Sequence, residues 1–422
     1  MSGAATSQET IYALSSAPGR AGVAVIRVSG PAAGAALAAL AGSAPVPARK
    51  AVLRVLRGGD GAAIDRALVL WLPGPGSFSG EDMAEFQCHG GRAVVEAVLE
   101  ALAAVPGLRP AEPGEFTRRA VENGRLDLTQ AEAIADLVDA ETGAQRRQAL
   151  RQYEGALANL YEDWRTRLIR ASAYAEAEID FSEEEIPDGL AAQSRAAIAG
   201  IAGEIEAHLA DGHRGERVRE GLHLTVLGLP NAGKSSLLNA LAKRDVAIVT
   251  ETPGTTRDVI EVHLDLGGYA VIVADTAGLR QTDEAIEAEG VRRALARAQS
   301  ADLVLLLLDG TAADPYDGLP DGVAQRAHLT VWNKADLPWP ERREGLAISA
   351  KSGEGLAALI DTIAQRVRLL LDESGTPPLT RPRHRHALGQ ALAALRRSLA
   401  TDEAELAAED LRLAVRAIGR IT

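Results

Sequence analysis

The feature that most constrains this chain is a phosphate-binding loop placed near its middle. The segment "GLPNAGKS" at residues 228–235 fits the pattern G-x-x-x-x-G-K-[ST], with the β-like run "LHLTVL" before it and the helical run "SSLLNALA" after it. In this context the backbone N–H groups of the loop and of the helix N-terminus cradle phosphates. The pattern therefore predicts an α/β nucleotide-binding domain, and the long segment before it needs a fold of its own.

The same loop supplies the residues expected to hold a phosphate chain. Lys234 is expected to reach the β- and γ-phosphate oxygens and so to take part in catalysis, and the Ser235 hydroxyl is expected to ligate Mg²⁺. A glycine turn with a chance lysine is the alternative, and the segments that follow make it a poor one. The predicted phosphate contacts are Asn231, Ala232, Gly233, Lys234, Ser235 and Ser236.

Two segments further along have the order expected of a nucleotide-dependent switch. In "TPGTTRD" (252–258), Thr256 can ligate Mg²⁺ and respond to the γ-phosphate. The run "VIVADTAGL" ends a predicted strand with Asp275, placed as a Walker-B acid. Gly278 follows it, and its N–H can meet the γ-phosphate.

The segments "WNKAD" (332–336) and "ISAKSGEG" (348–355) predict a guanine site. Asp336 can accept hydrogen bonds from N1–H and the exocyclic amine of guanine, whereas adenine lacks that pattern and would leave the carboxylate unpaired. The sequence therefore favours GTP over ATP, and disfavours a P-loop kinase that uses ATP. We expect Asn333 and Lys334 to brace the loop and the base. We expect the guanine oxygen to be contacted by the backbone of Ser349, Ala350 and Lys351.

The residue that positions the attacking water is left open by the motifs. Ras-like enzymes place a glutamine after the glycine of D-x-x-G, and this chain has Leu279 there. The acids of "RQTDEAIEAEG" could replace it from the next segment, although each can equally be a solvated residue of a helix. The candidates are Asp283, Glu284, Glu287 and Glu289.

Charge restricts the interaction with nucleic acid. The net charge is −13 and the sequence pI about 5.2, which argues against a bulk electrostatic grip on a polyanion. Any nucleic-acid contact must be local or shared with a partner. Local candidates are "RPRHRH" (381–386) and the arginines Arg165, Arg167 and Arg170, and solvated helix faces are the alternative for each.

The sequence predicts a cytoplasmic protein that does not enter a membrane. Its longest apolar run, Leu303–Leu308, is far below the roughly 18 residues that indicate a membrane span. The N-terminus has no basic segment followed by an apolar stretch. Cys88 is the only cysteine, so no internal disulfide can form.

The pattern of apolar, capping and turn residues along the chain predicts an α/β plus α-helical fold with an inserted Ras-like domain. Runs at 23–28 and 67–72 indicate strands of an N-terminal α/β unit over 1–118, and Thr129 with Glu132 predicts a capping box that opens a helical region. About forty helical residues at the end cannot bury a core alone, so we expect 376–422 to pack with 119–215. Residues 216–375 then form a domain inserted between them.

Three segments outside the nucleotide motifs carry a family resemblance. They are "PGRAGVAVIRVSG", "LPGPGSFSGEDMAEFQCHGG" and "RPAEPGEFTRRAVENGRLDLTQAEAIADLVDA". Together with the nucleotide motifs they resemble the MnmE (TrmE) family of tRNA-modification GTPases over essentially the whole chain. The resemblance implies a folate-binding N-terminal domain, a discontinuous helical domain that carries the GTPase domain, and a homodimer.

The resemblance also implies an activity and its cofactors. With an FAD-containing partner, MnmG (GidA), in a heterotetramer or larger assembly, the family adds an aminomethyl or carboxymethylaminomethyl group to carbon 5 of the tRNA wobble uridine. A tetrahydrofolate derivative (5-formyl or 5,10-methylene) supplies the carbon, and the partner holds most of the tRNA. The GTPase domains pair across GTP when K⁺ binds.

The resemblance assigns further residues by motif. The K⁺ ligands would be Asn231, Thr250, Thr252 and Thr255, of which Thr250 and Thr255 also line the GTP site, and Glu287 would orient the water. Folate contacts would be Arg27, Glu81 and Arg125, the last standing where lysine is common.

The C-terminal end of this sequence differs from the family pattern. Members finish in Cys-x-Gly-Lys near the folate, whereas this sequence ends at "RAIGRIT". We therefore expect GTP hydrolysis in K⁺ without unaided uridine modification. The alternative function is a regulatory GTP switch in RNA or ribosome assembly, without modification chemistry.

Overall fold

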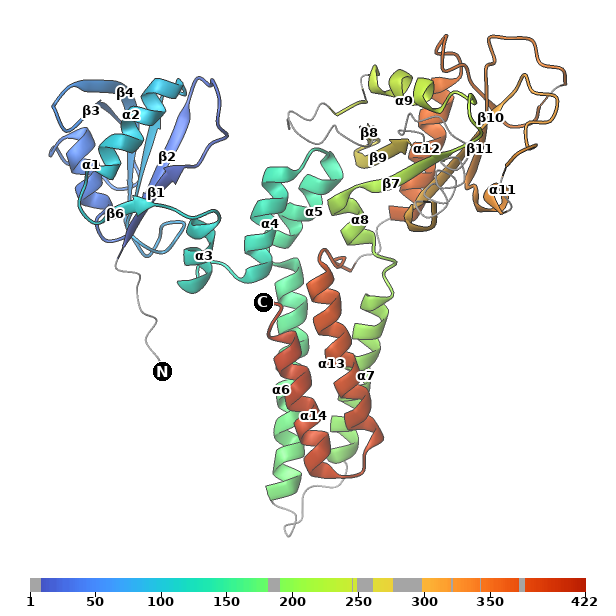
Figure 1. Cartoon of the computed structure of the whole chain (residues 1–422). Coiled ribbons are helices and arrows are strands. Elements are labelled where there is room, and N and C mark those ends of the chain that lie inside the picture. Colours follow the sequence, from blue (N-terminus) through green and yellow to red (C-terminus); the bar gives the residue numbers. More distant parts are fainter. Residues whose placement is uncertain are drawn as a thin grey trace, which may run out of the picture. The chain divides into compact units, whose positions relative to one another are not determined.

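The computed structural model describes residues 9–180, 190–244, 246–248, 261–275, 298–319, 322–341, 343–371 and 376–422, without the side chains of 178–180, 190, 191 and 275. The chain divides into two compact units, Met1–Ala131 and Glu132–Thr422 (Figure 1). No helix among these described residues is both long enough and apolar enough to cross a membrane.

The N-terminal unit is built around one sheet with strand order β3-β4-β5-β2-β1-β6. Neighbouring strands are antiparallel except β1 and β6. Helices α1 (Ala33–Ala41) and α2 (Arg92–Ala103) pack on the sheet over a core that includes Ile26, Phe86 and the buried Cys88. The strands are β1 (Thr10–Leu14), β2 (Ala24–Ser29), β3 (Val52–Arg57), β4 (Ala63–Leu72), β5 (Met83–Cys88) and β6 (Leu108–Pro110).

Helix α3 (Glu115–Glu122) is followed by α4 (Leu128–Asp139), and the start of α4 corrects one prediction. The capping box is formed by Asp127 and Gln130: the Asp127 carboxylate accepts from the Gln130 N–H at 2.9 Å, and the Gln130 side chain accepts from the Asp127 N–H at 3.1 Å. The prediction of Thr129 and Glu132 was wrong because Asp127 precedes the first helical residue, which makes it the N-cap. Thr129 instead donates to Asp127 at 2.6 Å.

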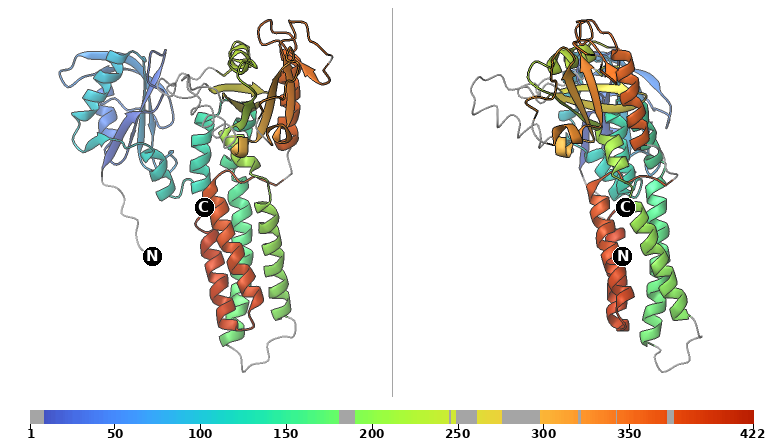
Figure 2. Two further views of the ribbon diagram at one scale, coloured as in Figure 1. Left: turned by 45° about the vertical axis from the view of Figure 1, so that its right-hand side comes forward. Right: turned by 90° about the vertical axis from the view of Figure 1, so that its right-hand side faces the viewer.

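Four long helices form a bundle from two separate stretches of sequence. Helices α6 (Ala156–Asp180) and α7 (Leu190–Leu209) share a core with α13 (Pro382–Ala400) and α14 (Ala404–Ile418). The four run side by side in both views of Figure 2. Buried side chains such as Tyr161, Trp164, Ile205 and Leu395 fill the space between them, and the shorter α5 (Gly143–Tyr153) precedes the bundle.

The second sheet has the order β12-β11-β10-β7-β9-β8 and is parallel except for β8. The apolar run 303–308 is its central strand β10, which is buried along its length, as expected when both faces of a parallel sheet are covered. Its strands are β7 (Leu222–Leu227), β8 (Glu261–Leu266), β9 (Tyr269–Asp275), β10 (Leu303–Asp309), β11 (Leu329–Asn333) and β12 (Leu346–Ala347).

The helices that accompany this sheet are α8 (Arg214–Glu220), α9 (Lys234–Ala242), α11 (Val323–Arg326) and α12 (Leu356–Leu371). Helix α8 lies directly before β7. The carboxyl ends of parallel strands lie at one edge of a sheet, which is where such folds bind ligands. The segments after β7, β10, β11 and β12 therefore meet there.

Candidate functional sites

The phosphate-binding loop links β7 to α9 and is packed too tightly for side chains at two positions. A Cβ on Gly228 would lie 2.3 Å from the Leu307 carbonyl oxygen of β10, and Gly228 has a φ of +153°. A Cβ on Gly233, at φ +99°, would lie 2.2 Å from Asn333 Nδ2. Glycine is therefore required at both positions by close contacts as well as by backbone conformation.

Lys234 begins α9 and is held over the loop. Its ammonium donates hydrogen bonds to the carbonyl oxygens of Gly228 at 2.8 Å and Leu229 at 2.9 Å, and the residue is only 8% exposed. Asn231 lies in the left-handed region at φ +61° and is exposed, as are Ser235 and Ser236. The loop thus presents its polar tip and the start of a helix, where backbone N–H groups favour an anion.

Asn333, at the end of β11, ties the phosphate-binding loop to the segment after β12. Its Nδ2 donates to the Ala232 carbonyl at 2.7 Å, and its Oδ1 accepts from the Ala350 N–H at 3.0 Å. The side chain is 3% exposed, so both hydrogen bonds are protected from water. One amide therefore fixes the spacing between two predicted parts of the nucleotide site.

The predicted base-binding loop is ordered by Ser349. Its buried hydroxyl donates to Asp336 Oδ1 at 2.7 Å and accepts from the Ser352 N–H at 3.0 Å. The backbone N–H of Ala335 donates to the Ile348 carbonyl at 2.9 Å. Asp336 is exposed, so its carboxylate is oriented by one hydrogen bond and remains accessible to a base. Lys351, two residues after Ser349, is also exposed.

Asp309, at the end of β10, is a site residue that the sequence analysis missed. Lys334 Nζ lies 2.5 Å from Asp309 Oδ2, and the Thr311 hydroxyl donates to Asp309 Oδ1 at 2.6 Å. Burial raises the pKa of the Asp309 carboxyl, but the hydrogen bonds from Lys334 and Thr311 outweigh it and hold this pKa below its usual range. Its position in the sequence could have indicated a role, because an acid at the carboxyl end of the apolar run 303–308 must lie at the same sheet edge as the phosphate-binding loop.

Several predicted residues lie outside the described part of the chain. The structure includes Asp275 as the last residue of β9, where its backbone pairs with Val226 of β7, and its side chain is not described. The segments that carry the switch threonines and the candidate water-positioning acids are not described. These residues are Thr250, Thr252, Thr255, Thr256, Gly278, Leu279, Asp283, Glu284, Glu287 and Glu289.

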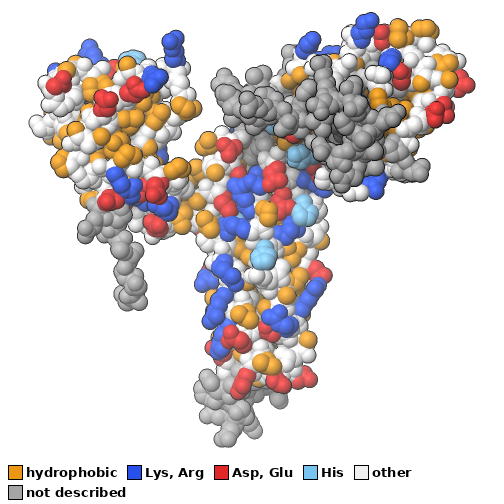
Figure 3. Space-filling model, viewed as in Figure 1, with side chains coloured by type: hydrophobic (Ala, Val, Ile, Leu, Met, Phe, Trp, Pro, Cys, Tyr) orange, Lys and Arg blue, Asp and Glu red, His pale blue; other side chains and the backbone are white. Residues whose placement is uncertain are grey.

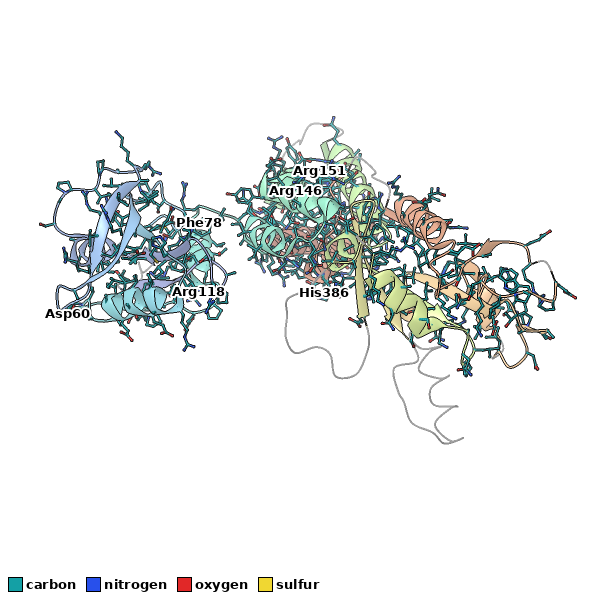
Figure 4. The ribbon with its side chains drawn as sticks, turned by 90° about the horizontal axis from the view of Figure 1, so that it is seen from above. Asp60, Phe78, Arg118, Arg146, Arg151 and His386 are labelled. Atoms are coloured by element: carbon teal, nitrogen blue, oxygen red, sulfur yellow. The ribbon has the colours of Figure 1, made fainter. Side chains whose placement is uncertain are left out.

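In the N-terminal unit, Arg27 of β2 is held by a carboxylate and two aromatic rings. Its guanidinium lies 2.9 Å from Glu85 on the neighbouring strand β5. The ring centroids of Phe78 and Phe116 lie 5.2 and 5.7 Å from its Cζ, within range for cation–π attraction. In Figure 4, Phe78 and Arg118 lie on the side of this unit opposite Asp60 of the β3–β4 turn.

Glu81 belongs to a neighbouring buried network. It accepts a hydrogen bond from the Ser29 hydroxyl at 2.7 Å and pairs with Arg119 at 3.1 Å. Arg119 also pairs with the buried Glu115 at 3.0 Å, and Arg109 pairs with Glu115 at 2.7 Å. Hydrogen bonds from Arg109, assisted by those from Arg119 and the Glu112 N–H, outweigh burial and lower the pKa of Glu115 to about 2.

Arg125 lies at the edge of this network and is exposed. A Cβ on Gly80, which has a φ of +83°, would approach Arg125 Cγ at 3.1 Å, so the arginine stem lies over the residue before Glu81. Arg27 and Glu81 are related through Ser29, which shares a face of β2 with Arg27 and bonds to Glu81. Each of the two charged groups nevertheless has its own partner of opposite charge.

Comparison with known proteins decides the family. The family model described as "MnmE helical domain" matches residues 128–422, and that described as "GTP-binding protein TrmE N-terminus" matches residues 10–125. A relative from Rhodospirillum rubrum, named tRNA modification GTPase MnmE, is 54% identical over 98% of this chain and 95% of its own length. A relative of the same name from Paramagnetospirillum magneticum is 56% identical with the same coverage. The chain belongs to the MnmE (TrmE) family.

A partial similarity to a solved structure accompanies this family match. The Y63A variant of Era from Aquifex aeolicus, bound to GDP and AlF₄⁻, is 25% identical and covers 43% of this chain and 68% of that chain. The TM-score is 0.27.

In this MnmE-family chain the structure brings some of the predicted site residues into contact with one another. Asn333, Ala232 and Ala350 are joined by hydrogen bonds, and Ser349 is joined to Asp336. The sequence analysis missed Arg119, Glu115 and the two phenylalanines beside Arg27. The segment "EPGEFTRRA" was quoted for the family, but nothing in its spacing indicates a pairing with Glu81, which lies far earlier in the chain. The roles of all these residues toward ligands stay predictions.

Proposed function

We propose that this chain is a GTPase that acts in the modification of tRNA. The observation that carries the proposal is the double hydrogen bond of Asn333, which joins a P-loop to the loop of a guanine-type motif. It occurs in a chain that is 54% identical to a relative named tRNA modification GTPase MnmE. A phosphate chain and a base held at a fixed separation are what hydrolysis of a nucleoside triphosphate requires.

We assign the nucleotide contacts as follows. Lys234 and the loop N–H groups neutralise phosphate charge, Asp336 binds the guanine edge, and Asn333 holds the two loops at their spacing. The hydroxyls of Ser235 and Thr256 hold Mg²⁺, which neutralises charge on the β- and γ-oxygens when bound. The tight packing of Gly228 against Leu307 supports this assignment, because the bare backbone is what approaches phosphate.

Activation by K⁺ and pairing of two GTPase domains are the finer part of the proposal. Asn231, Thr250, Thr252 and Thr255 would ligate K⁺, and Glu287 would orient the attacking water. The exposed, left-handed Asn231 at the tip of the loop supports this, because its side-chain amide is accessible from outside the loop.

For the N-terminal unit we propose binding of a tetrahydrofolate derivative by Arg27, Glu81 and Arg125. Phe78 and Phe116 beside Arg27 offer flat apolar surface that a pterin ring can stack on. The folate would supply the carbon that is added at carbon 5 of the wobble uridine. This chain would act as a homodimer together with the FAD-containing partner MnmG.

The proposed domains are 1–118, 119–215 with 376–422, and 216–375. The shared core of α6, α7, α13 and α14 supports the pairing of the two helical segments. The separate apolar core of the second sheet supports the assignment of 216–375 as an inserted GTPase domain.

The first test is GTP hydrolysis by the whole chain in K⁺ against the same buffer with Na⁺. Strong stimulation by K⁺, with dimerised GTPase domains in GDP and AlF₄⁻, is the expected result. Equal slow rates in both ions would reject K⁺ activation. Binding of 5-formyltetrahydrofolate is measured in parallel by calorimetry, because a simple GTP switch needs no folate, and absence of binding would reject the N-terminal assignment.

A further inference from the structure

A hollow at one end of the helical bundle is lined mainly by arginines. It has a volume of about 440 Å³ and is bordered by Arg165 of α6 and by Val415, Arg416, Gly419 and Arg420 at the end of α14. The Arg165 side chain lies against the end of α14, because a Cβ on Gly419 would lie 3.5 Å from Arg165 Nε, an ordinary van der Waals distance. Basic side chains gather along the bundle, including its border beside α6 and α14 (Figure 3).

The positive charge of this hollow is only weakly balanced within the chain. Arg416 and Arg420 are exposed and form no ion pair with any carboxylate of the described residues. Arg165 pairs with Glu162 at 3.1 Å, but both side chains are 40% or more exposed, and such pairs contribute little. Arg420 Nε donates to the Arg416 carbonyl oxygen at 3.4 Å, and the terminal N–H groups of Arg416 and Arg420 are available to an anion.

The last turn that carries Arg420 is anchored by its backbone. Arg383 donates to the carbonyl oxygens of Arg420 at 3.3 Å and Ile421 at 3.0 Å. Arg383 is in turn held by Glu132 at 2.5 Å. The backbone of Arg420 is thus fixed before any ligand arrives, so only side-chain freedom remains to be lost on binding.

Most of the other arginines of the bundle differ because carboxylates hold them. Among the described residues the exceptions are the exposed Arg170 of α6 and Arg195 of α7, which donates to the Leu399 carbonyl oxygen at 2.6 Å. In the "RPRHRH" segment, one of the two predicted nucleic-acid patches, Arg381 pairs with Asp136 and Arg385 with Asp211. In the other patch, Arg167 pairs with Glu204 and Asp163. Further pairs along the helices are Arg396 with Glu206, Arg397 with Asp410, and Arg412 with Glu176. Unpaired arginines therefore concentrate at the hollow rather than in "RPRHRH".

We propose that Arg165, Arg416 and Arg420 bind backbone phosphates of RNA. Guanidinium groups match the geometry of phosphate oxygens and bind them in pairs. Contacts of this kind position an RNA without reading its sequence. Because the chain has a net charge of −13, an RNA contact must be local, and this is a local excess of positive charge. The inference rests on the proposed function, which makes tRNA the substrate.

The test is titration of an unmodified tRNA transcript into the whole chain at a series of salt concentrations. Arg416→Gln with Arg420→Gln should weaken binding about five- to tenfold at low salt and reduce the slope of log K against log salt by about 2. The matched control is Arg396→Gln with Arg397→Gln, which removes the same charge from carboxylate-paired arginines of α13. It should leave both quantities near those of the unchanged chain.

Equal affinity and slope in the two double variants would overturn the proposal, because bulk charge would then account for binding. Equal competition by polyglutamate of matched charge would overturn the assignment to RNA in favour of an acidic protein surface. Affinity for GDP and K⁺-stimulated hydrolysis are measured on the same preparations. If these fail in the unchanged chain the proposed function fails, whereas a chain that keeps them and lacks the salt-slope difference refutes only the arginine hollow.

Discussion

The nucleotide site and the charged site of the N-terminal unit are built by different means. At the nucleotide site the backbone determines the geometry, because Gly228 and Gly233 have no room for a Cβ and Asn333 bonds to main-chain atoms. At the N-terminal site charged side chains determine the geometry, because Glu115 and its arginine partners neutralise one another in the protein interior. The first site should therefore be sensitive to added volume, and the second to lost charge.

The largest expected effect is the replacement Glu115→Gln. It leaves Arg119 buried without its full complement of negative charge, so the free energy of unfolding of the N-terminal unit should fall by about 3–5 kcal/mol. Hydrogen exchange of the amides of β1 and β2 measures this. Glu96→Gln, which breaks an exposed pair with Arg92, is the control and should leave the stability nearly unchanged. A loss of GDP affinity without loss of stability would contradict the division between the two sites.

The next effect is that of Gly228→Ala on the nucleotide site. The added methyl group would collide with the Leu307 carbonyl of β10, so the loop must shift, and we expect GDP affinity to fall about 100-fold, or about 2.7 kcal/mol. Calorimetric titration with GDP measures it. Gly200→Ala on α7, where a Cβ meets nothing within 4 Å, is the matched control. Unchanged affinity for GDP in the Gly228 variant would show that the loop is not constrained by volume.

A smaller effect is expected for Asn333→Ala. This change removes two hydrogen bonds between loops but leaves the backbone of each loop intact, so GDP affinity should fall about tenfold. Asn239→Ala, at an exposed position of α9, should have no effect. If the Asn333 variant bound GDP as tightly as the unchanged chain, the spacing of the loops would be set by the strands alone.

The smallest effect is the pH dependence of the N-terminal network. Hydrogen bonds from Arg109 and Arg119 lower the pKa of Glu115 from 4.5 to about 2, so the unfolded chain binds this proton first as the pH falls. The stability that Glu115 contributes is fully present above pH 4.5 and is lost progressively toward pH 2. Urea unfolding at pH 7, 5 and 3 should show the gap between the unchanged chain and Glu115→Gln narrowing only at pH 3. A gap that stays constant would contradict the role of the charge.

The same contrast explains which parts could be predicted from the sequence. The P-loop and the guanine-type loop follow from local spacing, because a backbone-built site needs given residue types at fixed intervals. The pairs Arg27 with Glu85 and Arg119 with Glu81 join residues far apart in sequence, so no local pattern announces them. The capping box was misplaced by two residues because both Asp127 and Thr129 are good N-caps and only the observed helix start distinguishes them.

The sharing of one core by α6, α7, α13 and α14 has a consequence for synthesis on the ribosome. The first two helices emerge with apolar faces that only the last two can cover, and the whole second sheet is translated in between. At typical elongation rates this interval lasts on the order of ten seconds or longer. During that time the nascent chain carries an uncovered half-bundle, so it depends on chaperones more than a chain whose neighbouring helices are translated consecutively.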